Sequence, residues 1–93
     1  MPRWTRVVGD GIAYEGPCLL LTILYYPSGS GHYVDIYDGL DTTAGKKFHR
    51  IRASGTVSRT VRLGNGVPFN AGIYVDGEDS DEETTIVFEP LPV

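Results

Sequence analysis

The sequence predicts an all-β protein: one antiparallel β-sandwich of seven or eight strands, jelly-roll-like, that forms a single domain over residues 1–93. Apolar runs bounded by turn residues recur at intervals of roughly 8–12 residues, a spacing typical of sandwiches and barrels. Twelve glycines and six prolines interrupt the chain too often for long helices. No stretch keeps the i, i+3, i+4, i+7 apolar spacing of an amphipathic helix over three turns.

The strongest strand prediction is the apolar segment CLLLTILYY at residues 18–26. Strict alternation places one set of side chains on one face (Leu19, Leu21, Ile23, Tyr25) and a second set on the other (Cys18, Leu20, Leu24, Tyr26). Both sets are apolar, and only Thr22 interrupts them. A strand without polar alternation is normally covered on both faces. In so small a chain, we expect a partner subunit to cover the second face.

Shorter strands are predicted on either side of this segment. Residues 3–8 carry Trp4, and a brief extended piece at 12–14 follows a Gly-Asp-Gly turn. Pro27 ends the apolar strand because it cannot donate a backbone hydrogen bond. The tip SGSG and a returning strand at residues 32–38 then predict a β-hairpin over residues 16–39, with tyrosines on the outer side of the second strand.

The second half of the chain contains the remaining strands. Residues 46–53 form a strand with an expected bulge, because Phe48 and Ile51 fall on opposite faces. Residues 56–63 form the next strand, a tight turn is predicted at Gly-Asn-Gly, and 67–69 is a short edge-like segment. The last two strands are predicted at residues 73–75 and 84–89.

Composition limits the possible functions. The net charge is −4 with a sequence pI of about 4.9, so we expect no nucleic-acid partner and no attraction to anionic membranes. The longest apolar run is far shorter than the ~20 residues of a spanning helix. The first residues lack the apolar core of a signal peptide, which predicts a soluble protein made in the cytoplasm. One cysteine excludes an internal disulfide, and we expect Cys18 to be a buried, inert thiol.

No set of residues predicts catalysis or a cofactor. The acidic segment at residues 76–83 holds six of the twelve carboxylates, but it lacks the order of a calcium-binding loop, so a solvated loop is expected. The cluster of Asp35, Asp38 and Asp41 is not expected to bind a metal, because Asp38 and Asp41 are expected to act in turns. His32 and His49 provide too few ligands for zinc. We therefore predict a protein that is not an enzyme and holds no metal or cofactor.

Charge is segregated along the chain. Six of the eight basic residues lie between positions 46 and 62, whereas the carboxylates concentrate at 76–83. The two segments could pair between neighbouring copies and fix their orientation. They could equally neutralise each other within one copy if the fold brings them together.

Aromatic residues outside the expected core suggest an interaction surface. Tyr and Trp are favoured at interfaces because the ring can be buried while the polar tip stays hydrated. The same residues would also suit a sugar-binding platform. The predicted interface set combines aromatic, apolar and basic side chains: Trp4, Leu20, Leu24, Tyr26, Tyr33, Tyr37, Tyr74, Arg50, Arg52 and Arg59.

The segments VDIYDGLDTTAGKKF and GTVSRTVRLGNGVPFNAGIYV, followed by a final strand, resemble small β-sandwich proteins of tailed-bacteriophage virions. The resemblance covers about residues 11–88 and lies in the order of strands and turns. It implies a non-enzymatic particle component located in the virion: a capsid decoration (cement) protein, or a spike, fibre or tail module. Such proteins are often homo-oligomers, commonly trimers, and the implied partner is the major capsid protein. The resemblance supplies no catalytic residues.

Two other interpretations remain open. The first is a carbohydrate-binding or receptor-binding β-sandwich module of a phage tail or fibre, in which Trp4 and the strand tyrosines stack on sugar rings. The second is a small metal-binding or enzymatic domain.

Overall fold

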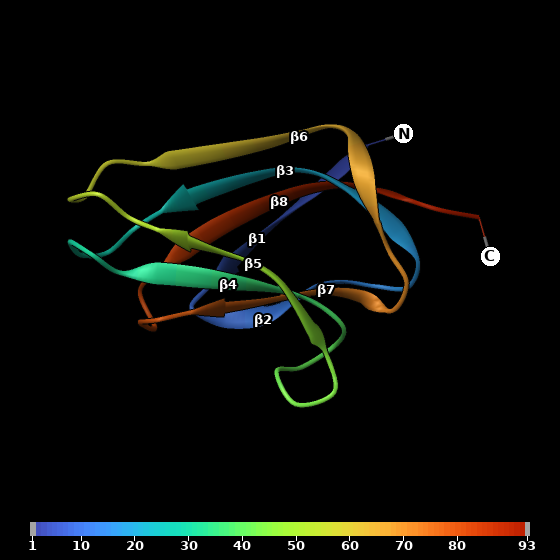
Figure 1. Cartoon of the computed structure of the whole chain (residues 1–93), viewed down its shortest axis with the longest axis horizontal. Coiled ribbons are helices and arrows are strands. Elements are labelled where there is room, and N and C mark those ends of the chain that lie inside the picture. Colours follow the sequence, from blue (N-terminus) through green and yellow to red (C-terminus); the bar gives the residue numbers. More distant parts are fainter. Residues whose placement is uncertain (1, 93) are drawn as a thin grey trace.

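The computed structural model describes residues 2–92, which form eight strands and no helix (Figure 1). The strands are β1 (Arg3–Val8), β2 (Asp10–Glu15), β3 (Cys18–Tyr26), β4 (Tyr33–Asp38), β5 (Lys46–Arg52), β6 (Arg59–Phe69), β7 (Gly72–Gly77) and β8 (Glu83–Pro90). They form two four-stranded antiparallel sheets, in the orders β1-β8-β3-β6 and β2-β7-β4-β5. This arrangement confirms the predicted all-β sandwich, and eight strands divided in this way are the architecture of a jelly roll.

The core lies between the two sheets and is filled by alternate side chains of every strand. Ile23 and Ile86 face it from the first sheet, and Ile36 and Val75 from the second; all four are fully buried. Cys18 is also fully buried, and burial together with the charge of Asp38 raises the pKa of its thiol to about 11. Its position confirms the prediction of a small buried hydrophobe, since a thiol with a raised pKa is a poor nucleophile.

The predicted hairpin over residues 16–39 is wrong, because β3 and β4 belong to different sheets. The segment between them carries the chain from the first sheet to the second, and β3 pairs instead with β6 and β8. Among the connections of residues 2–92, only β4–β5 joins neighbouring strands of the same sheet. A glycine-rich tip is compatible with either kind of connection, so the local sequence could not distinguish them.

The predicted face assignment of β3 is also wrong. The pairing register shifts between Leu20 and Thr22 against both neighbouring strands. A bulge of this kind adds one residue and reverses the alternation beyond it. As a result Cys18, Leu20, Ile23 and Tyr25 all point into the core. Leu20 therefore lies inside the sandwich and contributes no side chain to the surface on which we had placed it.

β6 runs further than predicted and contains no tight turn. Its pairing with β3 continues on both sides of Gly64-Asn65-Gly66, with a register shift opposite Leu20 and Thr22. Gly64 and Gly66 have φ values of 61° and 103°, which accommodate the irregularity without ending the strand. The segment at 67–69 is thus the end of β6 and not a separate strand, and β6 begins at Arg59 and not at 56.

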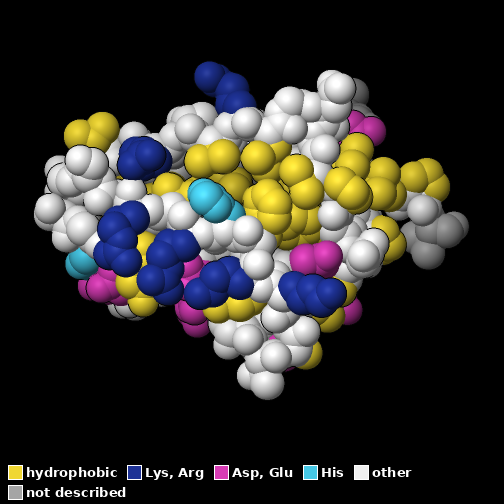
Figure 2. All heavy atoms as spheres, in the orientation of Figure 1, with side chains coloured by type: hydrophobic (Ala, Val, Ile, Leu, Met, Phe, Trp, Pro, Cys, Tyr) yellow, Lys and Arg dark blue, Asp and Glu magenta, His cyan; other side chains and the backbone are white. Residues whose placement is uncertain are grey.

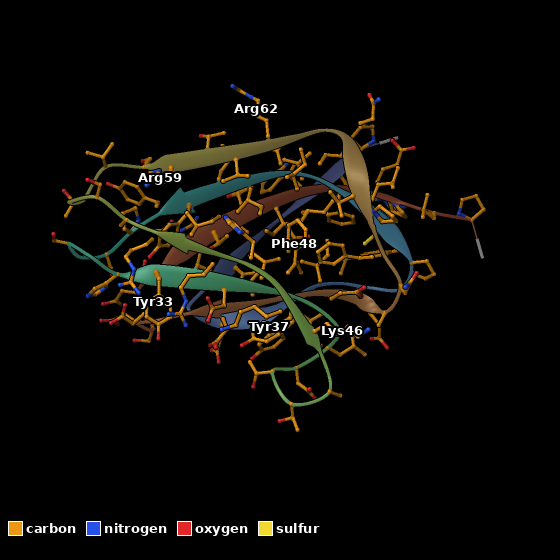
Figure 3. All side chains as sticks on the ribbon, viewed as in Figure 1. Tyr33, Tyr37, Lys46, Phe48, Arg59 and Arg62 are labelled. Carbon is orange, nitrogen blue, oxygen red and sulfur yellow. The ribbon has the colours of Figure 1, made fainter. Side chains whose placement is uncertain are left out.

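The two long sides of the sandwich differ. At one side β1 and β2 follow each other around Gly9, whose backbone N–H donates to the Glu82 carbonyl at 2.7 Å. At the other side lie the edge strands β5 and β6, and apolar side chains are visible between them (Figure 2). Phe48 faces this gap and packs against Phe69 with 5.2 Å between ring centroids (Figure 3). The register shift in β5 next to Phe48 confirms the predicted bulge.

Candidate functional site

The outer face of the first sheet carries most of the large apolar side chains that the fold leaves exposed. Trp4 and Val8 project from β1 with exposed fractions of 69% and 55%. Leu24 and Tyr26 project from β3 with 40% and 58%. Isolated exposed hydrophobic residues are ordinary, but several on one sheet face indicate an interaction surface. We call these four residues the apolar face.

The four residues of the apolar face lie on β1 and β3, which flank β8 in the sheet. Tyr26 pairs with Glu83 of β8, which in turn pairs with Val8 of β1. Two residues along, Leu24 lies in the row of Thr85 and Arg6. Arg6 and Glu83 form an ion pair at 2.6 Å, so the charges inside this face neutralise each other. The exposed apolar side chains of β1 and β3 are thus separated, on the strand between them, by Thr85 and by the Glu83 carboxylate that pairs with Arg6.

A shallow open depression of about 300 Å³ adjoins the apolar face at the β3–β6 boundary. Leu24 and Tyr26 line one side, and Arg59, Thr60 and Glu83 provide polar groups. Its lining includes Tyr25 and the exposed Tyr26, together with hydrogen-bond donors and acceptors. Arg59 is partly engaged, because its guanidinium donates to the Arg52 carbonyl at 2.9 Å.

The outer face of the second sheet is charged and internally paired. Arg50 binds Asp35 in a bidentate arrangement, at 2.7 Å for Nε and 3.0 Å for Nη2. Lys47 Nζ lies 3.3 Å from the same carboxylate. Burial alone would raise the pKa of Asp35, but hydrogen bonds from Arg50 and Lys47 hold it below its usual value. Asp35 is 3% exposed, so these two cations are what keeps a charged carboxylate in a buried position.

The tyrosines of this face are covered by neighbouring side chains. The Arg50 guanidinium lies 3.8 Å from the Tyr33 ring centroid, and that of Arg52 lies 5.3 Å away. Tyr37 is only 9% exposed and contacts Tyr74 edge to face, with 6.4 Å between centroids. The predicted interface residues of this face therefore belong to an intramolecular network, in contrast to Trp4, Leu24 and Tyr26.

A row of lysines and arginines follows β5 (Figure 2). Arg62 projects from β6 on the opposite side of the gap (Figure 3). Within residues 2–92, no basic residue of the segment 46–62 forms an ion pair with a carboxylate of the segment 76–83; the ion pairs of Lys47 and Arg50 are with Asp35. The two segments therefore do not neutralise each other through ion pairs within one copy. Such neutralisation was one of the two interpretations of the charge segregation.

Sequence reasoning missed a buried polar cluster at the end of the sandwich where the β3–β4 and β7–β8 connections meet (Figure 1). Glu82 is fully buried, which corrects its assignment to a solvated acidic loop. Its carboxylate contacts His32 Nδ1 at 2.6 Å and accepts hydrogen bonds from the Ser28 hydroxyl at 2.9 Å and backbone N–H at 3.1 Å. The long sequence separation of these residues left no local pattern to find.

In this cluster His32 and Glu82 each shift the pKa of the other in the direction that favours its charged form. The hydrogen bond to Glu82 is the main cause that raises the pKa of His32. Burial would raise the pKa of Glu82, but Tyr25, His32 and Ser28 together hold it below its usual value.

The geometry differs from that of a catalytic triad. Both Ser28 Oγ, at 3.3 Å, and the Glu82 carboxylate approach the same ring nitrogen of His32, Nδ1. A triad uses the two imidazole nitrogens separately, one for the nucleophile and one for the orienting carboxylate. The arrangement fits a structural link between two connections, which joins them through a charge-assisted hydrogen bond.

Over residues 2–92 no group of three or more His, Cys, Asp or Glu side chains is arranged to hold a metal ion. In the same part of the chain, no helix is long and apolar enough to span a membrane. No protein-family model matches the chain, and no significant match is found among curated proteins or solved structures.

Proposed function

We propose that this protein is a non-enzymatic structural component of a tailed-bacteriophage virion, most simply a capsid decoration (cement) protein. In this proposal it is a homo-oligomer, with a trimer favoured, that binds the major capsid protein and stabilises the shell. The observation that carries the proposal is the apolar face of the first sheet. Trp4, Val8, Leu24 and Tyr26 remain exposed in a sandwich whose core is otherwise closed around apolar residues.

The physical argument concerns the cost of exposing these groups. Burial of apolar surface contributes roughly 25 cal/mol per Å², so large side chains left in water favour a partner that covers them. Each contact of one copy with a shell would be modest. An oligomer that binds several symmetry-related positions converts modest contacts into strong retention.

The particle itself provides the test. Phage particles that lack this gene product should assemble but lose resistance to heat, and purified protein added back should restore it. A Trp4→Ala/Tyr26→Ala variant should fold and fail to restore resistance, whereas an Arg62→Ala variant should restore it. If deletion leaves heat resistance unchanged, or if the protein is absent from purified particles, the proposal is wrong.

One observation favours a second candidate, a carbohydrate-binding or receptor-binding module of a tail or fibre. The depression beside Tyr26 offers an aromatic ring together with Arg59, Thr60 and Glu83, a combination that suits a sugar. A glycan array would test it, with Tyr26→Ala as the binding-deficient variant and Tyr37→Phe as the control. Binding that Tyr26→Ala abolishes would favour this function over the first, and absence of binding at millimolar sugar would exclude it.

A further inference from the structure

The second sheet has two free edges that run in opposite directions. Its order is β2-β7-β4-β5, and each neighbouring pair is antiparallel. With four strands, the first and the last are therefore antiparallel to each other. If a second copy is placed beside the first in the same orientation, its β2 runs antiparallel to β5 of the first copy. The sheet can thus continue from one copy to the next without any change of strand direction.

The two edges carry opposite charges on their outer side. On β5, Lys47 and Arg50 approach the outward carboxylate of Asp35, and Arg52 lies over Tyr33. On β2, Asp10 and Glu15 are exposed, and Asp10 pairs with Asp76 of β7. Burial, followed by the charges of Asp10 and Asp35, raises the pKa of Asp76, so this edge has an excess of negative charge.

Each edge strand also contains one bulge, at which two consecutive residues lie on the core side. In β2 the register shifts between Ile12 and Tyr14, so that Ala13 and Tyr14 both lie on the core side. In β5 the shift lies between His49 and Lys47. Phe48 packs on the core residue Phe69, and His49 pairs with the core residue Ile36, so both belong to the core side.

When β5 of one copy is paired with β2 of the next, outward residues lie opposite outward residues along both strands only if the two bulges are also opposite each other. That register places Arg52 opposite Asp10, Arg50 opposite Ile12, and Lys47 opposite Glu15. On the core side it places Phe48 opposite Tyr14. A slip of one residue would reverse the faces of one strand, and a slip of two would misalign the bulges.

We propose that copies of this chain associate head to tail by pairing β5 of one copy with β2 of the next, in the register that sets Arg52 against Asp10 and Lys47 against Glu15. This rests on the self-association in the proposed function and specifies its contact. Pairing of β5 with another β5 would juxtapose cations, and pairing of β2 with β2 would juxtapose carboxylates, so the charges select the head-to-tail contact. Such a contact between unlike surfaces generates a ring when the rotation closes.

Cysteine cross-linking tests the register. Residues directly opposite on antiparallel strands have Cα atoms about 4.5–5.5 Å apart, which lies within the range of about 4.4–6.8 Å that a disulfide spans. The Asp10→Cys/Arg52→Cys variant should therefore oxidise to covalent oligomers on a non-reducing gel. Within one copy β2 and β5 are separated by three strand spacings, about 14 Å, so any bond between them joins two copies. The native Cys18 is fully buried and does not compete.

The matched control is Asp10→Cys/Lys46→Cys, which also replaces one acid and one base on the two edges. In the proposed register these positions are six residues apart along the strands, about 20 Å, and should not cross-link. If light scattering shows an oligomer but both variants cross-link equally, or neither does, this contact is wrong and the proposed function is unaffected. If the unmodified chain is a monomer at every concentration, both this contact and the proposed self-association are wrong.

Charge reversal provides a second test. Arg52→Glu and Asp10→Lys should each weaken association about tenfold, because each places like charges opposite each other. The variant that carries both changes restores opposite charges and should recover most of the association. Arg62→Glu, on the first sheet, should have no effect. Failure of the combined variant to recover, with both single variants weakened, would contradict the proposed pairing.

Discussion

Both outer faces of this sandwich are formed by alternate side chains of their strands. They differ in what covers their large side chains. On the second sheet, Tyr33 lies under two guanidinium groups, and Tyr37 is 9% exposed beside Tyr74. On the first sheet, Trp4 and Tyr26 are 69% and 58% exposed. The comparison separates aromatic residues that stabilise the fold from those left available to a partner. From the sequence alone, the covered aromatic residues could not be distinguished from the exposed ones.

The largest expected effect concerns two tyrosines, one from each face. Tyr37→Ala removes a nearly buried ring and should lower the free energy of unfolding by about 3 kcal/mol. Tyr26→Ala removes an exposed ring and should change it by less than about 0.5 kcal/mol. Urea unfolding followed by fluorescence measures both. Equal losses for the two variants would remove the distinction between the faces.

The next effect tests the ion-pair network of the second sheet. Arg50→Ala leaves the buried Asp35 carboxylate with Lys47 as its cation. Because the Arg50 side chain is itself exposed, we expect a measurable loss of stability that is smaller than the loss for Tyr37→Ala and below that for fully buried pairs. Arg62→Ala, which is exposed and has no ion pair within residues 2–92, is the control and should be nearly neutral. A neutral Arg50→Ala would mean that the network does not stabilise the sheet.

A comparable effect is expected at Gly66, which lies in β6 beside the bulge of β3. A Cβ atom there would lie 2.9 Å from Leu21 Cδ2 and 3.1 Å from Leu19 Cβ, at a φ of 103°. Gly66→Ala should destabilise the fold by about 2 kcal/mol. Gly64→Ala has a positive φ but open space around it, and should cost about 1 kcal/mol. Equal thermal stability of the two variants would show that the contact with β3 is unimportant.

The smallest effect is the pH dependence of the His32–Glu82 link. The pKa of His32 is raised in the folded protein, so its contribution is complete below the ordinary value of about 6.5 and is lost as pH rises through the raised value. The pKa of Glu82 is lowered, so its contribution is present above about 4.3 and is lost as pH falls through the lowered value.

Thermal unfolding between pH 5 and 9 measures the His32 contribution. His32→Gln cannot gain a charge, so this variant should lack the decline of the melting temperature that the native chain shows on the alkaline side of the histidine transition. The same decline in both proteins would assign it to another group.

Much of the fold could be predicted from the sequence because strand position depends on local pattern. The starts and ends of β1, β3 and β4 were predicted to within a residue. The bulge in β5 was also predicted, because Phe48 and Ile51 violate simple alternation. Strand pairing was not, because the connection between β3 and β4 crosses from one sheet to the other. Pairing depends on contacts between distant segments, which local turn chemistry does not encode.

The candidate surface was predicted in part. Trp4, Leu24 and Tyr26 are exposed, whereas Leu20 is in the core. The error at Leu20 arose from the bulge in β3, which lies in an entirely apolar run where no polar residue marks the change of face. Glu82 was misplaced for a related reason: its partners Ser28 and His32 are about fifty residues away, with separations of 54 and 50.

The central claim is that this sandwich acts as an oligomer, and light scattering during size-exclusion chromatography tests it most directly. The account predicts a discrete species of more than one chain, with three times the chain mass of 10.2 kDa as the favoured result. Raised salt should shift this species towards the monomer, because opposite charges orient the proposed contact. A single species of 10.2 kDa at every concentration, at low as well as high salt, would contradict the account.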